Sequence, residues 1–163
     1  MKRENAKFNF FNFILILLTA IQFSACSGDS TVYEKYHVFN DKSWNRFDYL
    51  DYEVPLNDPD AEYDVFVDIR HEPDIPYKEI LISLTIYSPS GSMRSANHTL
   101  DLVDRQGKPL SQCSGDICNI VIPVRSHLTI NEAGIVKFEI ENKYTKIEMP
   151  GIVQVGLIVK KSK

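Results

Sequence analysis

Two runs of alternating side chains near the middle of the chain constrain its fold most strongly. Residues 63–70 alternate apolar with mostly polar side chains, and residues 80–87 repeat the pattern after a segment that holds Pro73 and Pro76. Alternation with a period of two is typical of a strand with one buried face and one wet face. Proline cannot donate to a strand ladder, so the connecting segment is a loop. We therefore predict two strands here that pair antiparallel with each other.

Further runs of strand character surround this pair. They cover residues 32–39, 47–55, 93–103, 117–124, 135–141 and 152–160. Turn signals separate them, and at most one helical turn is expected, within residues 142–151. About eight strands without alternating helices predict an all-β fold, a single antiparallel β-sandwich. The predicted core draws on Val65, Val67, Ile69, Ile82, Leu84, Ile86, Phe138, Val155 and Leu157.

Residues 1–25 have the features of a bacterial lipoprotein signal peptide. A basic head of Lys2, Arg3 and Lys7 precedes a mostly apolar run, and small residues lead into Cys26. A membrane-spanning anchor would need roughly 20 apolar residues, which is more than this run supplies. We therefore expect cleavage before Cys26 and lipidation of its thiol.

Cleavage at that point sets the organisation of the mature chain. We expect a lipidated tether over residues 26–31 and the β-sandwich domain over residues 32–163. The signal peptide takes three of the 18 basic and one of the 22 acidic residues, which leaves 15 basic against 21 acidic residues. Nucleic-acid binding needs a basic face that neutralises phosphates, so this balance argues against it.

Cys113 and Cys118 are the cysteines that remain after Cys26. Three alternatives stand for them: a disulfide across a turn, two free thiols, or a metal or redox site. Thiols in an exported domain tend to oxidise, and Gly115 between them suits a turn. No His or second Cys pair lies nearby at ligand spacing, and a redox dithiol usually has two intervening residues rather than four. We expect a disulfide that holds a loop.

The sequence contains no recognisable catalytic or cofactor motif. A nucleophile elbow, a phosphate-binding loop and a zinc-ligand motif are all missing from it. The histidines lie in separate segments, as His37, His71, His98 and His127. The cluster Asp68, Arg70, His71, Glu72 and Asp74 is best interpreted as a polar strand face, in which Asp68 and Arg70 pair with each other or across the sheet. We predict no catalytic residues, no metal site and no cofactor.

Aromatic side chains are dense near the start of the domain, as Tyr33, Tyr36, Trp44, Tyr49 and Tyr52. Such residues either fill a sandwich core or present a stacking surface to a sugar. We expect Trp44 to plug the core or its rim. Exposure of Trp44 and two of the tyrosines in one groove would favour carbohydrate binding, which is the alternative function.

Short motifs in a fixed order give the chain a family resemblance. They are Val32-Tyr33-Glu34-Lys35-Tyr36 after the lipoprotein cysteine, Trp44, Tyr63, Ile69-Arg70, Pro76-Tyr77, residues 89–91, Gly134 before Val136-Lys137-Phe138, and Gly151-Ile152 before Val155-Gly156-Leu157. By these motifs the chain resembles the gliding-motility lipoprotein family GldH of Bacteroidetes over nearly the whole mature sequence. The pair of Cys113 and Cys118 departs from the family pattern, and no function is assigned to it.

The resemblance implies a lipid-anchored envelope protein without enzymatic activity. Members of this family serve the machinery that moves these bacteria over surfaces and that is linked to adhesin secretion. The partners it implies are other gliding or secretion proteins of the envelope, together with the membrane through the lipid anchor. Some lipoproteins of this bacterial group carry an acidic run after the cysteine that marks them for the cell surface. Because only Asp29 stands here, we expect the protein to face the periplasm.

Overall fold

The computed structural model describes residues 30–163, and their regular structure consists of strands. In chain order they are β1 (Thr31–Val38), β2 (Ser43–Asn45), β3 (Leu50–Leu56), β4 (Glu62–His71), β5 (Glu79–Tyr87), β6 (Met93–Asp101), β7 (Gln112–Ser114), β8 (Ile117–Thr129), β9 (Gly134–Asn142), β10 (Glu148–Pro150) and β11 (Ile152–Lys161). The predicted all-β class is confirmed.

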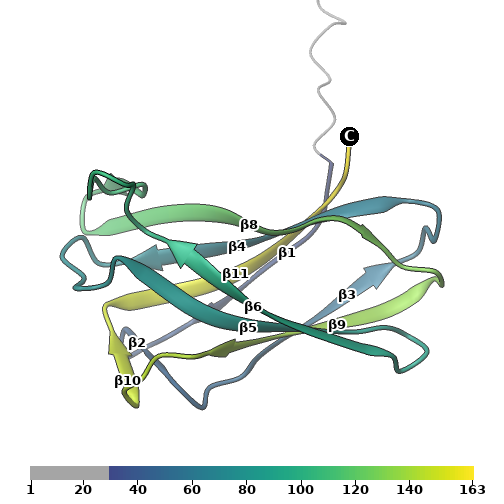
Figure 1. The fold of residues 1–163 in the computed structure, drawn as a ribbon, viewed down its shortest axis with the longest axis horizontal. Helices are drawn as coiled ribbons and strands as arrows, with labels where there is room; N and C mark the ends of the chain where they lie inside the picture. Colours follow the sequence, from purple (N-terminus) through teal and green to yellow (C-terminus); the bar gives the residue numbers. More distant parts are fainter. Residues whose placement is uncertain (1–29) are drawn as a thin grey trace, which may run out of the picture.

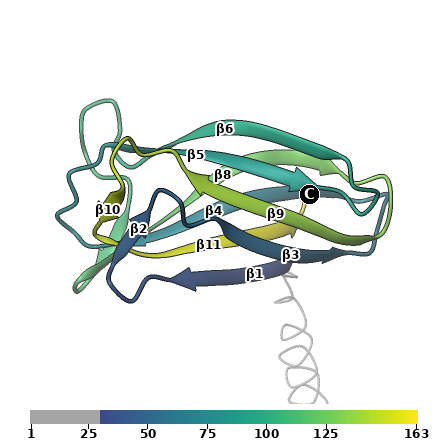
Figure 2. The ribbon, with the colours of Figure 1, turned by 90° about the horizontal axis from the view of Figure 1, so that it is seen from below.

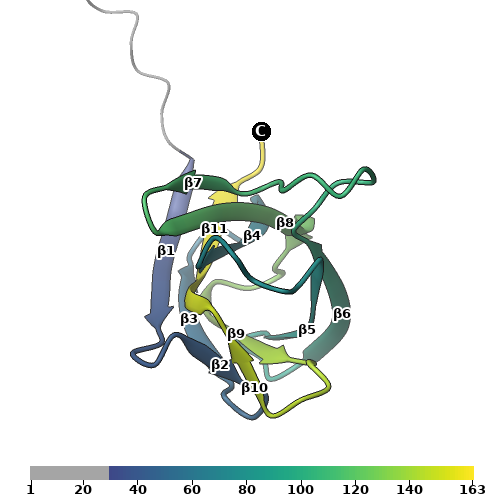
Figure 3. The same ribbon diagram turned by 90° about the vertical axis from the view of Figure 1, so that its left-hand side faces the viewer.

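The strands form two sheets that enclose one core (Figure 1). One sheet has the order β1-β11-β4-β8-β7 and the other β3-β9-β5-β6, and every pairing within them is antiparallel. A ribbon of β10 and β2 lies at one end, where the view along the strands shows it in front of the core (Figure 3). The predicted antiparallel sandwich is confirmed.

The predicted pairing of the two central runs is wrong. β4 pairs with β11 and β8, whereas β5 pairs with β6 and β9, so the two strands belong to different sheets. Their connection, residues 72–78, crosses from one sheet to the other, as the side view shows (Figure 2). Alternation identifies the buried face of each strand but carries no information about its hydrogen-bonded neighbour, because both apolar faces point into the same core.

Three short strands, β2, β7 and β10, were not predicted. Each has three residues, too few to show an alternating pattern. β10 lies in the segment expected to hold at most a helical turn, and Met149 at its centre is buried opposite Trp44 of β2. The pairing with β2 is what orders this segment.

The core contains eight of the nine predicted side chains, and the ninth, Ile86, is only partly buried. Trp44 closes the core at the ribbon end with an exposed fraction of 0%. Its indole N–H donates to the carbonyl of Asp48 at 3.1 Å, and its own carbonyl accepts from the buried Asn142 amide at 3.0 Å. The expectation that Trp44 plugs the core is confirmed.

The two long sides of the sandwich differ. On the side of β1 and β3, the buried Tyr52 hydroxyl of β3 donates to the carbonyl of Val155 in β11 at 2.8 Å, which ties one sheet to the other. On the opposite side, β6 is the last strand of its sheet, and β8 pairs with β7 only through residues 117–119. The edge of β8 beyond Asn119 therefore has no strand partner within the described chain.

Candidate functional site: a groove between two sheet edges

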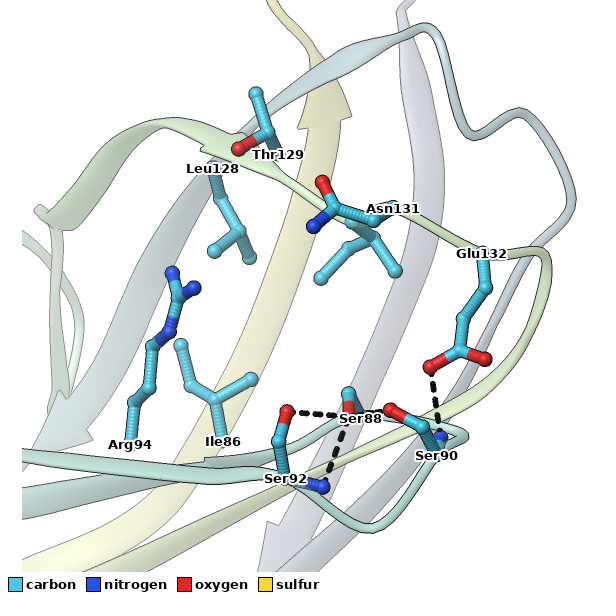
Figure 4. A pocket seen from close by; sticks show the side chains of 10 residues that line it. Ile86, Ser88, Ser90, Ser92, Arg94, Leu128, Thr129, Asn131 and Glu132 are labelled. Atoms are coloured by element: carbon cyan, nitrogen blue, oxygen red, sulfur yellow. Dashed lines mark hydrogen bonds between the residues drawn. The ribbon is translucent and has the colours of Figure 1, made fainter.

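A groove opens between β6 and β8, on the side where the sheets do not join. Its main hollow has a volume of about 220 Å³. Leu84 and Leu128 form its apolar floor, and Arg94, His98 and Arg125 stand at its walls. A second hollow of about 90 Å³ shares Leu128 and Arg94 and extends to the turn between β5 and β6 (Figure 4). We call the two hollows together the β6–β8 groove.

The register of β5 with β6 explains why the core ends here. Leu84 faces the core, so Ala96 opposite it faces the same way, as do Arg94 and His98 on either side. The charged Arg94 is exposed to solvent and Ala96 is small, so this face of β6 covers less of the core than Val, Ile or Leu would. Ile86, opposite Arg94, consequently remains partly exposed. This explains why Ile86 is the one predicted core residue that is not fully buried.

A disturbed strand places the second arginine at the groove. Arg125 lies opposite the buried Val65, and the pairing of β4 with β8 shifts register on both sides of Val65. Such shifts mark bulges, which bend a strand and redirect its side chains. Arg125 therefore reaches the same opening as Arg94, although it comes from the other sheet.

The groove carries positive charge that the described chain does not neutralise. None of the ion pairs or side-chain hydrogen bonds within residues 30–163 involves the guanidinium of Arg94 or Arg125. Burial lowers the pKa of His98, and the charge of the nearby Arg125 lowers it further, which favours the neutral imidazole. The groove thus offers two fixed cations above an apolar floor.

Hydrogen bonds hold the rim at one end of the groove. In the turn between β5 and β6, the hydroxyls of Ser88 and Ser92 lie 2.7 Å apart, and the Ser92 N–H donates to the Ser88 hydroxyl at 3.1 Å. The Ser90 N–H donates to Glu132 at 2.8 Å, which joins this turn to the connection between β8 and β9 (Figure 4). Glu132 is therefore engaged with the rim, while Arg94 extends toward Leu128 across the opening.

The polar cluster singled out from the sequence does not form a site. Arg70 donates to Gln154 of β11 at 3.0 Å, and Asp68 accepts from Tyr36 of β1, so both pair across the sheet as predicted. His71 points the other way and is buried, with its Nδ1 2.6 Å from the Glu72 carbonyl, while the Glu72 carboxylate pairs with Lys42. Among the residues the structure describes, no group of three or more His, Cys, Asp or Glu side chains could hold a metal ion.

Tyr36 covers a carboxyl that is almost completely buried on the outer face of its sheet. Asp68 has an exposed fraction of 2%, and the Tyr36 hydroxyl lies 2.8 Å from its Oδ2 and 2.7 Å from Glu34. Burial raises the pKa of Asp68, although the Tyr36 hydrogen bond and the charge of Arg70 oppose this effect. The Arg70 guanidinium stacks on the Tyr36 ring, 4.5 Å from its centre. This arrangement fixes Tyr36 flat on the sheet.

The aromatic residues do not form the sugar-binding surface that the alternative function requires. Trp44 and Tyr52 are buried, Tyr33 and Tyr36 are partly buried, and Tyr49 alone of the five is exposed. A different pair, Tyr77 and Tyr144, packs edge to face at 5.3 Å beside an open hollow near the ribbon. Burial raises the pKa of Tyr77 to about 12, and its hydroxyl donates to the carbonyl of Pro150 at 3.1 Å.

The predicted modification sites fall in two places. Cys26 lies outside the described residues. Cys113 and Cys118 face each other across the hairpin of β7 and β8 with their Cα atoms 3.9 Å apart, and the structure joins their sulfurs in a disulfide. Gly115 makes the turn between them with a φ of 62°. A disulfide in the exported protein stays a prediction, which alkylation can test.

Sequence reasoning missed the groove. A signal was present, because β6 alternates Arg94, Ala96 and His98 at inner positions, whereas its neighbour β5 carries Ile80, Ile82, Leu84 and Ile86. The strand was expected, but its polar inner positions could not be assigned to an opening without knowledge of its place at the edge of the sheet.

Within residues 30–163, no helix has the length and apolar character needed to cross a membrane.

A profile of the GldH lipoprotein family matches residues 31–159. The protein described as gliding motility lipoprotein GldH homolog of Christiangramia forsetii is 25% identical over an alignment of 159 residues, and the match covers 93% of this chain and 96% of that protein.

Two solved structures share a distant likeness. AlgX of Pseudomonas aeruginosa is 17% identical with a TM-score of 0.38, and the match covers 85% of this chain and 28% of AlgX. TmCBM61, solved in complex with beta-1,4-galactotriose, is 15% identical with a TM-score of 0.34, and the match covers 80% of this chain and 81% of that one. Scores this low support no inference about function.

Proposed function

The chain belongs to the GldH lipoprotein family, and from that premise we propose that this gliding motility lipoprotein is a non-catalytic docking component of the gliding machinery, linked to adhesin secretion. The observation that carries the proposal is the family match, which runs from the first residue of β1 to the last part of β11. The match therefore covers both sheets and the β6–β8 groove.

The groove supports a binding role. An apolar floor beside two arginines without carboxylate partners is a surface suited to another molecule with acidic and apolar groups. A standard protein interface needs only ~800 Å² on each partner, which one side of a sandwich of this size can supply. A docking role also requires no catalytic residues, because binding neither forms nor breaks a covalent bond.

Lipidation at Cys26 would hold the domain close to the membrane. Bacterial lipoproteins carry more than one acyl chain, and stable anchoring needs more than one. Since β1 begins at Thr31, the tether from Cys26 spans at most about 18 Å even when fully extended. Partners would accordingly lie next to the membrane. Because the tether carries one acidic residue, Asp29, and no acidic run, we expect the domain to face the periplasm.

Deletion of the gene tests the proposal. We expect the deletion strain to lose or slow surface gliding, or adhesin secretion where the species does not glide, and to grow normally on ordinary carbon sources. Wild-type protein supplied in trans should restore the lost activity. A strain that glides and secretes normally but fails to grow on one polysaccharide would reject the proposal in favour of carbohydrate binding.

A further inference from the structure

We propose that the β6–β8 groove binds an extended segment of a partner protein, which adds to β6 as a further strand and directs acidic and apolar side chains into the groove. This inference rests on the proposed docking function and names the chemistry of the docked segment.

Backbone hydrogen bonds at the two ends of the β5–β6 pair show which backbone groups of β6 are free. Ser88 N–H donates to Ser92 at 2.8 Å, and Leu102 N–H donates to Lys78 at 2.9 Å, at the two ends of the β5–β6 pair. Hydrogen-bonded pairs recur at every second residue of an antiparallel ladder, and the register between these ends is unbroken. The even-numbered residues of β6 therefore bond to β5, and Ser95, Asn97 and Thr99 direct their N–H and C=O groups away from it.

Beyond the inward-facing charge of Arg94, residues 95–99 of the β6 edge lack the devices that usually block strand addition. Exposed edges are commonly protected by proline, bulges or charged side chains. β3 contains Pro55, the free part of β8 contains Pro123 and register shifts, and β1 has a register shift near its start. β6 has nine residues in continuous register without proline, and none of residues 95–99 carries Lys, Arg, Asp or Glu.

The groove specifies the side chains of the added strand. Residues of that strand opposite Arg94, Ala96 and His98 would point into the groove, because alternate residues share one face. The added residue opposite Arg94 would meet the unpaired charge of that arginine. The added residue opposite Ala96 would lie over Leu84 and Leu128, and the one opposite His98 would meet Arg125. The expected motif is acidic-x-apolar-x-acidic, with x facing solvent.

A synthetic peptide tests this motif in vitro. The probe is as long as β6, is capped at both ends, and carries Asp-Thr-Val-Thr-Glu at its centre, flanked by Ser and Thr. One control peptide replaces Asp and Glu by Lys. Two further controls keep the acidic residues and carry N-methyl groups on every second backbone nitrogen, one on the odd positions and the other on the even positions. The isotope-labelled mature protein, with Cys26→Ser to keep it unlipidated, is titrated with each peptide by NMR.

We expect saturable binding of the acidic probe with a Kd below about 1 mM. Amide exchange of Ser95, Asn97 and Thr99 should slow on binding, while the already bonded even-numbered amides should change little. The Lys and N-methyl peptides should bind at least about tenfold more weakly.

Matched variants separate charge from backbone pairing. Arg94→Glu with Arg125→Glu should weaken the acidic probe about tenfold or more, whereas Arg105→Glu, in an exposed turn away from the groove, should not. Asn97→Pro removes one free N–H and should weaken binding, whereas Asn97→Ala keeps that N–H and should not. If Asn97→Pro perturbs folding, the arginine pair still decides the question.

Failure of this inference is distinguishable from failure of the proposed function. No saturable binding, equal binding of the Lys peptide, or protection outside β6 would each overturn strand addition, and so would dimerisation of the protein through β6. If the peptide fails but the arginine variants still impair gliding, docking at the groove survives without strand addition. If the peptide binds as expected but those variants glide normally, the binding site stands and its role in gliding is refuted.

Discussion

Replacing Gly156 by alanine should destabilise the domain, although a glycine inside a strand ordinarily costs ~0.5–1 kcal/mol relative to alanine. Gly156 lies between Tyr36 of β1 and Asp68 of β4 in the sheet register. A Cβ atom added to Gly156 would lie 2.5 Å from two carbons of the Tyr36 ring, which forces the ring off the sheet.

The displaced ring would lose two interactions. One is the hydrogen bond of its hydroxyl to the buried Asp68 at 2.8 Å, of a kind that contributes about 1.5–3 kcal/mol when the acceptor is charged. The other is the stacking of Arg70 at 4.5 Å, which contributes about 0.5–1 kcal/mol at an exposed site. Replacing glycine by alanine recovers about 0.5–1 kcal/mol of this loss. Gly156→Ala should therefore lower the free energy of unfolding by about 1–3 kcal/mol.

Urea unfolding of the unlipidated mature chain measures this effect, with the slope checked for constancy. The matched background is Tyr36→Ala, in which the added methyl group meets no ring. There Gly156→Ala should be neutral or stabilise by up to about 1 kcal/mol. If Gly156→Ala stabilises the wild-type protein, or costs the same in both backgrounds, then the close approach of Tyr36 does not explain the glycine.

Three further outcomes follow from the structure. Because burial raises the pKa of Asp68 above its ordinary value of 3.8, the stability that this group contributes is full at low pH and is lost as pH rises through the folded-state pKa. Asp68→Asn should therefore unfold at higher urea than wild type near pH 7, with the difference vanishing below pH 3.8, and a difference independent of pH would contradict the assignment. Mass spectrometry of the unreduced exported protein should show Cys113 and Cys118 protected from alkylation, and replacing both by serine should cost about 2 kcal/mol for so short a loop; free thiols would refute the disulfide. Cys26→Ser should release the protein from membranes or leave it unprocessed, which fractionation and immunoblotting detect, and unchanged processing and retention would disprove lipidation there.

The sequence predicted the parts of this fold that depend on local pattern. Alternation located the eight long strands and the buried faces of Val65, Leu84 and Phe138, because a strand with one wet face must alternate. The partners of β4 and β5 could not be obtained in this way, since two strands that face one core show the same pattern whether they pair or lie in opposite sheets. The three-residue strands depend on tertiary contacts and leave almost no pattern of their own.

The candidate site was beyond prediction for a related reason. Arg94, Ala96 and His98 are ordinary residues for an exposed strand, and they form a groove only because β6 ends one sheet opposite the free edge of β8. Arg125 reaches the same opening through a bulge that depends on the register with β4. The family resemblance was carried by short motifs spread over the chain, and the match across residues 31–159 confirms it.

Gliding of a deletion strain that carries groove variants tests the central claim most directly. Arg94→Glu with Arg125→Glu reverses the charge of the β6–β8 groove, and Arg105→Glu serves as the control for altered surface charge, with immunoblots showing equal amounts of each protein. We expect the wild type and Arg105→Glu to restore gliding and adhesin secretion, and the groove variant to fail to restore them. Full restoration by the groove variant at equal abundance would contradict docking through this groove.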